Sequence, residues 1–135
     1  MTRGLRNNNP GNLVTSDVIY DGEIRPSQDR VFRQFKTMAY GYRAMFMLMG
    51  NYLKREIDTI EKIITTYAPP HENPTEAYIS QVSRATGIPR NRQLKSSDGA
   101  DFIKIVSAIS HVENGIRAVE SDVMAGFNLQ PAITN

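Results

Sequence analysis

The chain has 135 residues, of which 40% are hydrophobic and 22% charged, a composition typical of one compact globular domain. Its 16 Lys and Arg residues stand against 14 Asp and Glu residues, which argues against a protein that coats nucleic acid by charge alone. The absence of cysteine excludes disulfides, a thiolate nucleophile and a cysteine zinc site. Two histidines disfavour a multi-histidine metal site, so we expect neither a metal nor a cofactor.

The N-terminal residues, MTRGLRNNNPGN, have no apolar core of the kind found in secretory signals. The most apolar stretch, residues 38–49, contains Gly41 and Arg43. It is shorter than the ~20 apolar residues that span a bilayer. The sequence therefore predicts no signal peptide, no transmembrane segment and no membrane partner.

Residues 1–36 are predicted to form a loop and a β-lobe. Asn and Gly in residues 7–12 favour turns, and β-forming residues on both sides of an Asp-Gly turn predict an irregular hairpin over residues 17–36. Residues 37–127 have helical periodicity and form a predicted helical lobe, followed by a tail, residues 128–135. The expected fold class is mainly α with a small β-element (α+β), as a single compact domain.

The helical lobe contains a signal for the start or end of each expected helix. Thr37 caps a central helix that reaches Arg55. Asp58 and Glu61 have the spacing of a capping box, and the helix that they begin ends before Pro69. The remaining expected helices run from Asn73, as N-cap, to Gly87; from Ser97 or Asp98 to Glu113; and from residue 116 to about residue 125.

The most distinctive acid of the sequence is Glu113. At ~100° per residue, it falls inside the apolar arc of its helix, which Phe102, Ile105 and Ile109 help to form. It also lies in the last helical turn, where the helix dipole disfavours a negative charge. Both effects favour the protonated acid, as a general acid requires. The alternative interpretation is a solvated side chain at the helix end.

Other charged residues have two interpretations each. Glu23, beside the Asp-Gly turn, is either an acid facing a cleft or an ordinary hairpin residue. Glu72 lies in a turn that either borders an active site or starts a helix. A basic run consists of Arg84, Arg90, Arg92 and Lys95. It either binds an anionic polymer or is a solvated loop.

Five blocks of the sequence resemble a family of phage and prophage virion proteins described as lysozyme-like. They are RGLRNNNPGN (3–12), Tyr20 with Gly22, residues 32–52 with GYRA (41–44), residues 59–78 with YAPPHENPT (67–75), and HVENG (111–115). In the last block, Val112 stands where the family usually has a histidine. The resemblance covers nearly the whole chain. It implies an enzyme that cleaves peptidoglycan glycan strands, located in the virion or delivered to the bacterial cell envelope, with other virion proteins as partners.

The end of the Glu113 helix also resembles lytic transglycosylases and glucosaminidase modules, in which a Glu before a Gly-containing turn is the general acid. In those proteins an Asn-rich loop, a β-lobe and further helices follow and build the sugar groove. Here the Asn-rich loop comes first, an order that fits a circular permutation of a lysozyme-like fold. The resemblance implies Glu113 as the acid and Glu23 as the candidate second carboxylate. The implied substrate-binding residues are Asn8, Asn9, Asn12, Tyr20, Tyr67, Glu72 and Asn73.

Three functions follow from these observations. The first is a peptidoglycan-cleaving enzyme, either a muramidase-type hydrolase with two carboxylates or a lytic transglycosylase with one. The second is a non-catalytic virion structural or wall-binding protein on the same fold. The third, disfavoured by the low net charge, is a small nucleic-acid-binding domain that uses the basic run. The first requires Glu113 beside residues 8–12, with Tyr67 and Asn73 partly exposed along the same cleft.

Overall fold

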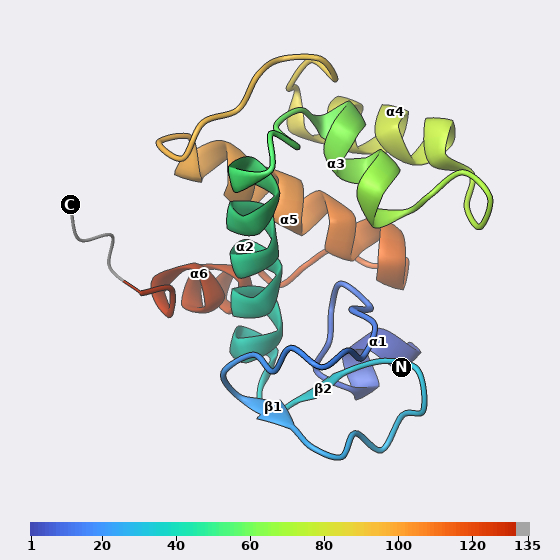
Figure 1. The fold of residues 1–135 in the computed structure, drawn as a ribbon, viewed down its shortest axis with the longest axis vertical. Helices are drawn as coiled ribbons and strands as arrows, with labels where there is room; N and C mark the ends of the chain where they lie inside the picture. The colour runs from blue at the N-terminus through green and yellow to red at the C-terminus, as the bar shows by residue number, and fades with distance from the viewer. Residues whose placement is uncertain (132–135) are drawn as a thin grey trace.

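Helix α2 (Met38–Lys54) runs through the middle of the computed structural model, which describes residues 1–131 (Figure 1). The Thr37 side chain accepts a hydrogen bond from the Tyr40 N–H and caps the helix as predicted. Tyr42, Met45 and Met49 are among the largest fully buried side chains of the protein. The prediction of a buried central helix is confirmed, since α2 is covered on several sides.

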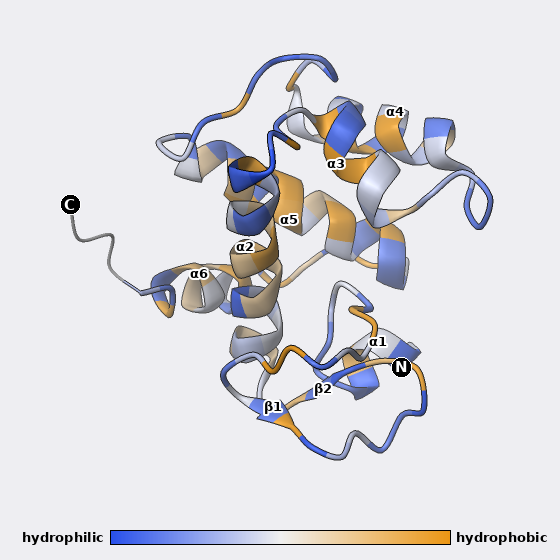
Figure 2. Ribbon diagram, viewed as in Figure 1, coloured by the Kyte–Doolittle hydropathy of each residue, from blue (hydrophilic) through white to orange (hydrophobic). Residues whose placement is uncertain are grey.

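Helices α3 (Ile60–Tyr67), α4 (Thr75–Thr86) and α5 (Gly99–Asn114) form the upper part of Figure 1. Helix α4 packs on α3 and α5, and α5 also contacts α2. Their apolar faces turn inward, as the hydropathy colours show (Figure 2). The buried isoleucines that fill the space between them are Ile60, Ile63, Ile64, Ile79, Ile105 and Ile109.

Helix α6 (Glu120–Asn128) packs against α2. The backbones are in near contact, because a Cβ at Gly126 would lie 2.5 Å from the Tyr42 Cβ. The predicted start at residue 116 is wrong, since the chain is extended up to Val119 (ψ 115°) and acids in the first turn favour a start at Glu120. Of the predicted tail, residue 128 belongs to α6 and residues 132–135 lie outside the described residues.

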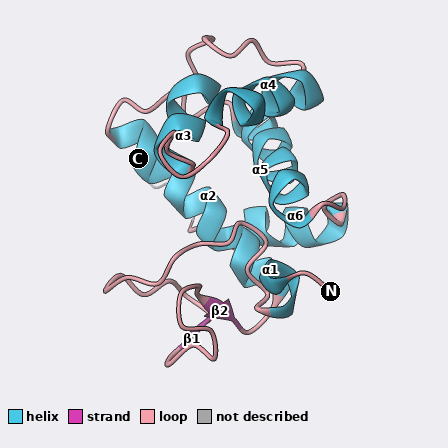
Figure 3. Ribbon diagram, turned by 90° about the vertical axis from the view of Figure 1, so that its right-hand side faces the viewer, coloured by secondary structure: helices cyan, strands magenta, loops and turns pink. Residues whose placement is uncertain are grey.

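The N-terminal segment lies beneath α2 and α5 (Figures 1 and 3). It contains a short helix, α1 (Arg3–Arg6), which the sequence analysis did not predict. Strands β1 (Glu23–Ile24) and β2 (Gln34–Phe35) pair antiparallel, with Glu23 opposite Phe35. The expected β-element is present, although each strand is only two residues long. The predicted class, mainly α with a small β-element, is confirmed.

Two helix starts differ from the prediction by one residue each. Helix α3 has Thr59 as its N-cap, and the Thr59 hydroxyl accepts from the Lys62 N–H. Asp58, the predicted cap, instead accepts hydrogen bonds from the Lys62 and Gln93 side chains. Helix α4 has Pro74 at its N-cap without a side-chain cap, because the Asn73 amide donates to the Pro69 carbonyl. In both cases a tertiary or loop contact occupies the side chain that could have capped the helix.

Asp29 connects α1 to the loop between the two strands. Its carboxylate accepts two hydrogen bonds from the Arg3 guanidinium, at 2.5 and 2.7 Å. It also accepts from the backbone N–H groups of Val31 and Phe32, at 2.9 and 3.0 Å. The Arg3 bond first, and then the backbone bonds, hold the pKa of Asp29 well below its ordinary value of 3.8. All of these donors favour the charged carboxylate.

The stability of the protein at acid pH is expected to depend on the Asp29 carboxylate. The folded protein binds the Asp29 proton more weakly than the unfolded chain, so the stability from these bonds is complete above pH 3.8. It is lost as the pH falls below that value toward the folded pKa. Asp29→Asn should lower the urea concentration at the midpoint of unfolding at neutral pH. This midpoint should also fall less in the variant than in the wild type when the pH is lowered from neutral to acid. An unchanged decline in the variant would contradict this assignment.

Candidate active site

Glu113 lies in the last turn of α5, which ends at Gly115 in the left-handed conformation (φ 73°). Its side chain is half-buried, and both carboxylate oxygens accept hydrogen bonds from the protein. The Asn12 amide donates to Oε1 at 3.0 Å and the Tyr78 hydroxyl donates to Oε2 at 2.8 Å. Residues from three distant parts of the sequence therefore fix the orientation of one carboxylate.

Asn12 reaches Glu113 because the Asn-rich loop packs closely on α5. Its backbone has a positive φ of 50°, a conformation that asparagine tolerates. Its Oδ1 is buried and has no hydrogen-bond partner among the described residues. A Cβ at Gly4 would lie 2.7 Å from this oxygen, so only glycine lets α1 approach so closely. A buried oxygen without a partner costs stability.

Asn114 holds the other side of the same loop. Its amide donates to the carbonyls of Pro10 at 2.7 Å and Ser110 at 2.9 Å. Its Oδ1 accepts from the Thr2 hydroxyl at 2.8 Å. Asn114 is buried, so these bonds are shielded from water. The end of α5 thus anchors the N-terminal segment and sets the position of Asn12 beside Glu113.

A groove of about 330 Å³ lies beside Asn12, between the N-terminal segment and the helices. Its lining includes Tyr20, Tyr52 and Tyr67 together with polar side chains such as Asn51. Tyr67 is half-buried, and its hydroxyl donates to the Gly11 carbonyl. Aromatic faces next to amide groups suit a sugar ring, which offers both C–H surfaces and hydroxyls. Glu113 itself does not line this groove, but it is hydrogen-bonded to Asn12, which does.

The tyrosines around Glu113 have perturbed acidities. Burial first, and then the Glu113 charge, raise the pKa of Tyr67 well above 10. Burial, the neighbouring Tyr67 and the bond to Glu113 raise the pKa of Tyr78 in the same direction. Burial raises the pKa of Tyr52 to about 12. The hydroxyls of Tyr67 and Tyr78 therefore stay protonated in the folded protein and act as donors.

Alkaline titration is expected to show the raised pKa values of Tyr67 and Tyr78. Because the pKa values of Tyr67 and Tyr78 are raised on folding, their contribution to stability is complete below pH 10 and is lost as the pH rises above it. Ultraviolet absorbance should show these two phenols ionising together with the loss of far-ultraviolet circular dichroism. Tyr78→Phe should remove one phenol from that cooperative step. Ionisation of both groups in the folded protein would contradict the assignment.

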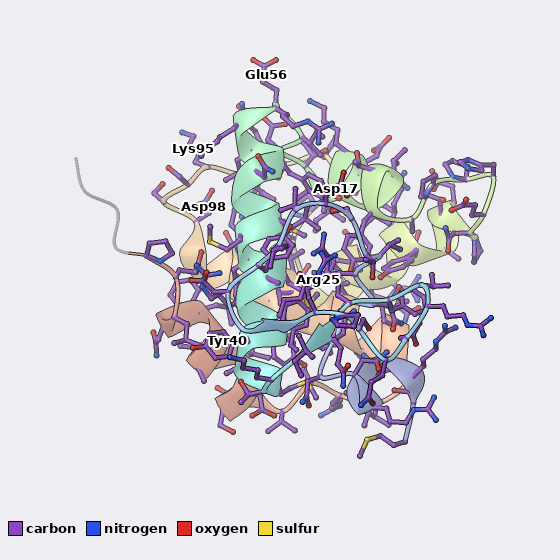
Figure 4. The ribbon with its side chains drawn as sticks, turned by 60° about the horizontal axis from the view of Figure 1, so that its bottom comes forward. Asp17, Arg25, Tyr40, Glu56, Lys95 and Asp98 are labelled. Atoms are coloured by element: carbon purple, nitrogen blue, oxygen red, sulfur yellow. The ribbon has the colours of Figure 1, made fainter. Side chains whose placement is uncertain are left out.

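Glu23, the other candidate carboxylate, lies in a separate cluster. Its side chain is fully buried and forms ion pairs with Arg25 and Arg33. Arg25, labelled in Figure 4, also donates to the carbonyls of Ser16 and Val18. The Glu23 carboxylate thereby balances a nearly buried guanidinium, which is a structural requirement. No hydrogen bond joins it to Glu113 in the described part of the chain.

The remaining candidate substrate-binding residues are distributed between interior and surface. Asn9 is 0% exposed, and its side chain bonds to Leu13 and Arg33 backbone groups. A ligand cannot reach it there. The Asn8 amide donates to the Phe35 carbonyl at 3.1 Å. Asn12, Tyr20 and Tyr67 line the groove, whereas Glu72 and Asn73 lie in the turn before α4, with Glu72 exposed and Asn73 half-buried.

Two of the four residues of the basic run, Arg90 and Arg92, are paired with acids. Arg90 forms ion pairs with Glu61 and Glu76 and so connects α3, α4 and the following loop. Arg92 pairs with Asp101 at the start of α5. A guanidinium that is already paired offers less charge to an anionic polymer. Within residues 1–131, no group of three or more metal-ligating side chains comes together, and no helix there is long and apolar enough to cross a bilayer.

Sequence reasoning missed Tyr78 and Tyr52 as site residues. Both have the spacing of ordinary core positions on apolar helix faces, and both are buried. Their hydroxyls distinguish them from other core residues, because a buried phenol needs a hydrogen-bond partner. A tyrosine at a core position of α4 was thus a signal that some acceptor faces this helix. Only the tertiary structure shows that the acceptor is Glu113.

One comparison with known proteins gives a relative. The chain is 39% identical over 130 residues to protein P5 of Pseudoalteromonas phage PM2. The matched region covers 93% of this chain and 79% of that phage protein. No protein-family model matches the sequence.

Proposed function

We propose that this chain, which belongs to the family of protein P5 of Pseudoalteromonas phage PM2, is a phage enzyme that cleaves the glycan strands of peptidoglycan. Glu113 is the proposed general acid. The enzyme acts from the virion or at the bacterial cell envelope. The lysozyme-like fold implied by the sequence blocks is part of the same proposal.

The observation that carries the proposal is the Glu113 carboxylate, oriented by Asn12 and Tyr78, together with the aromatic groove that Asn12 also lines. A general acid must be held within hydrogen-bond reach of the leaving oxygen, and its geometry matters before its acidity. A sugar chain in the groove would stack on Tyr20 or Tyr67 and present a glycosidic oxygen near Asn12. Glu113 would then give its proton to that oxygen as the bond breaks.

The reaction type follows from the number of available carboxylates. A hydrolase needs a second carboxylate to activate water or to attack the sugar. Glu23 is buried in ion pairs with Arg25 and Arg33, so it does not suit that role. We therefore favour a transglycosylase-like reaction, in which a group of the substrate takes the place of water. Its product is lighter than the hydrolysis product by one water molecule.

A specific observation favours a second candidate, a non-catalytic wall-binding protein. Both oxygens of Glu113 are already occupied by Asn12 and Tyr78. A site whose acid is held by hydrogen bonds to the protein can bind a glycan without cutting it. The third candidate, a nucleic-acid-binding domain, is weakened by the ion pairs of Arg90 and Arg92, because paired cations release fewer counterions from a nucleic acid.

Incubation with purified peptidoglycan separates these candidates. We expect soluble muropeptides to appear with time, and their masses should lack one water relative to hydrolysis products. Co-sedimentation with peptidoglycan in the absence of any release would favour the wall-binding protein. Neither release nor sedimentation, with peptidoglycan from several bacterial hosts, would overturn both proposals.

A further inference from the structure

A second cleft lies on the outer side of α5, away from Asn12 and the groove. It encloses about 560 Å³ and is lined by α5, the end of α4 and the connection from α5 to α6. Its polar lining residues are Lys104, Ser107, His111, Arg117 and Glu120. Neither the fold nor the proposed glycan cleavage requires a cationic cleft at this place.

The cations and neutral donors of this cleft come from two elements. Lys104, Ser107 and His111 are three and four residues apart, so they lie in one stripe along α5. Helical rise puts Lys104 and His111 about 10 Å apart along the axis. Gly115 then reverses the chain in a left-handed turn, and Arg117 returns to line the same cleft. Basic groups thus approach the space from two elements.

Three small side chains help to keep the cleft open. Ala85, Ala108 and Ala118 line it, and their methyl groups leave room that larger side chains would fill. Within residues 1–131, neither Lys104 nor Arg117 forms an ion pair or a side-chain hydrogen bond. Arg90 and Arg92, by contrast, are held by carboxylates. The donors of the cleft are therefore available to a ligand.

We propose that this cleft, lined by Lys104, Ser107, His111 and Arg117, binds a phosphate or diphosphate group. Phosphate offers several acceptor oxygens with concentrated negative charge, which match an arginine fork and a lysine point charge. The Ser107 hydroxyl and a nitrogen of the His111 ring add neutral donors. The group comes either from a soluble phosphate compound or from a lipid headgroup. This site is independent of the glycan-cleaving proposal.

The negative charge of Glu120 allows the proposal to be tested by strengthening binding as well as by weakening it. Glu120 is the one carboxylate that lines the cleft among the described residues, and it stands in the first turn of α6, where the helix dipole favours its charge. Its charge opposes an anionic ligand. Removing that charge should strengthen binding, whereas removing Lys104 and Arg117 should weaken it.

Titration of the ¹⁵N-labelled full chain with inorganic pyrophosphate at low ionic strength tests the site. We expect saturable amide shifts confined to residues around 104–120. Lys104→Gln with Arg117→Gln should weaken binding by about tenfold or more, given the strength of hydrogen bonds to charged groups. Glu120→Gln should tighten it. Both cations are exposed, so the double variant should retain the wild-type thermal midpoint.

The matched control is Lys54→Gln with Arg55→Gln, which removes two exposed cations at the far end of α2. Equal weakening in the control and the cleft variant would show attraction to net charge alone and overturn the site. Shifts that never saturate would overturn it as well. Sedimentation with phosphatidylglycerol vesicles, lost in the cleft variant, would identify a lipid headgroup as the source. Pyrophosphate binding without vesicle binding would identify a soluble phosphate compound.

Discussion

Glu113→Gln is expected to slow muropeptide release by ~10²–10⁴-fold, the usual contribution of a general acid. Glutamine has the size of glutamate and accepts from Asn12 through its oxygen, but it has no proton to give. Its amide donates to the Tyr78 oxygen, so the contact with α4 is retained with the donor and acceptor exchanged. The thermal midpoint should therefore stay close to that of the wild type, and timed assays on purified peptidoglycan give the rate.

Glu56→Gln is the matched control for this loss, because Glu56 is an exposed carboxylate just after α2 and is no candidate site residue. It should retain the wild-type rate. Glu23→Gln is unsuitable as a control, since it leaves the buried Arg33 without its counter-ion and destabilises the protein. A wild-type rate in Glu113→Gln would show that another group protonates the leaving oxygen. Tyr78→Phe should cause a smaller loss, because Asn12 still orients the acid.

Gly41→Ala is expected to lower the free energy of unfolding by about 1–3 kcal/mol or more through overpacking. A Cβ at this position would lie 2.1 Å from the Asn8 carbonyl oxygen and 2.6 Å from Cδ of Pro10. These atoms belong to the backbone and to a proline ring, so they cannot rotate away. Urea unfolding measures the loss. The displaced loop also contains Asn12, so the variant should lose activity as well.

Gly50→Ala provides the comparison in the same helix. Gly50 is exposed, and in the described part of the chain no atom lies within 4 Å of its added Cβ. Alanine there should raise the free energy of unfolding by about 0.5–1 kcal/mol, the ordinary helix preference over glycine. Equal effects of the two substitutions would show that close packing of the loop on α2 is unimportant. Opposite signs are the expected outcome.

Local signals in the sequence predicted most of the helical lobe correctly. Thr37 caps α2, and Gly87 and Gly115 end α4 and α5 in the left-handed conformation. Asp98, one of the two predicted starts of α5, is its N-cap residue but makes no side-chain cap bond. These signals depend on the backbone needs of single turns, which a sequence displays directly. Acids at the start of α6 were an equally local signal, but the prediction placed that helix too early because it followed Gly115 too closely.

The N-terminal part was harder to predict because side chains replace much of the backbone pairing there. Arg33 donates to the Val14 and Val18 carbonyls, and Asn9 bonds to Leu13 and Arg33 backbone groups. Such contacts have no period that a sequence could show. Glu113 could be singled out as the candidate acid from its helix position and the sequence blocks, whereas its hydrogen bond to Tyr78 could not be predicted. Features that depend on local geometry could be predicted from the sequence, whereas contacts made across the fold could not.

The long separation between Asn12 and Glu113, 101 residues along the chain, has a consequence for biosynthesis. The Asn-rich loop leaves the ribosome well before its partners on α5. Until α5 follows, the Pro10 carbonyl has no donor from that helix and the Asn12 amide has no acceptor. No chain that lacks α5 can therefore contain the assembled Glu113 cluster. A host that makes this protein would be exposed to its proposed activity only after α5 has folded onto the N-terminal segment.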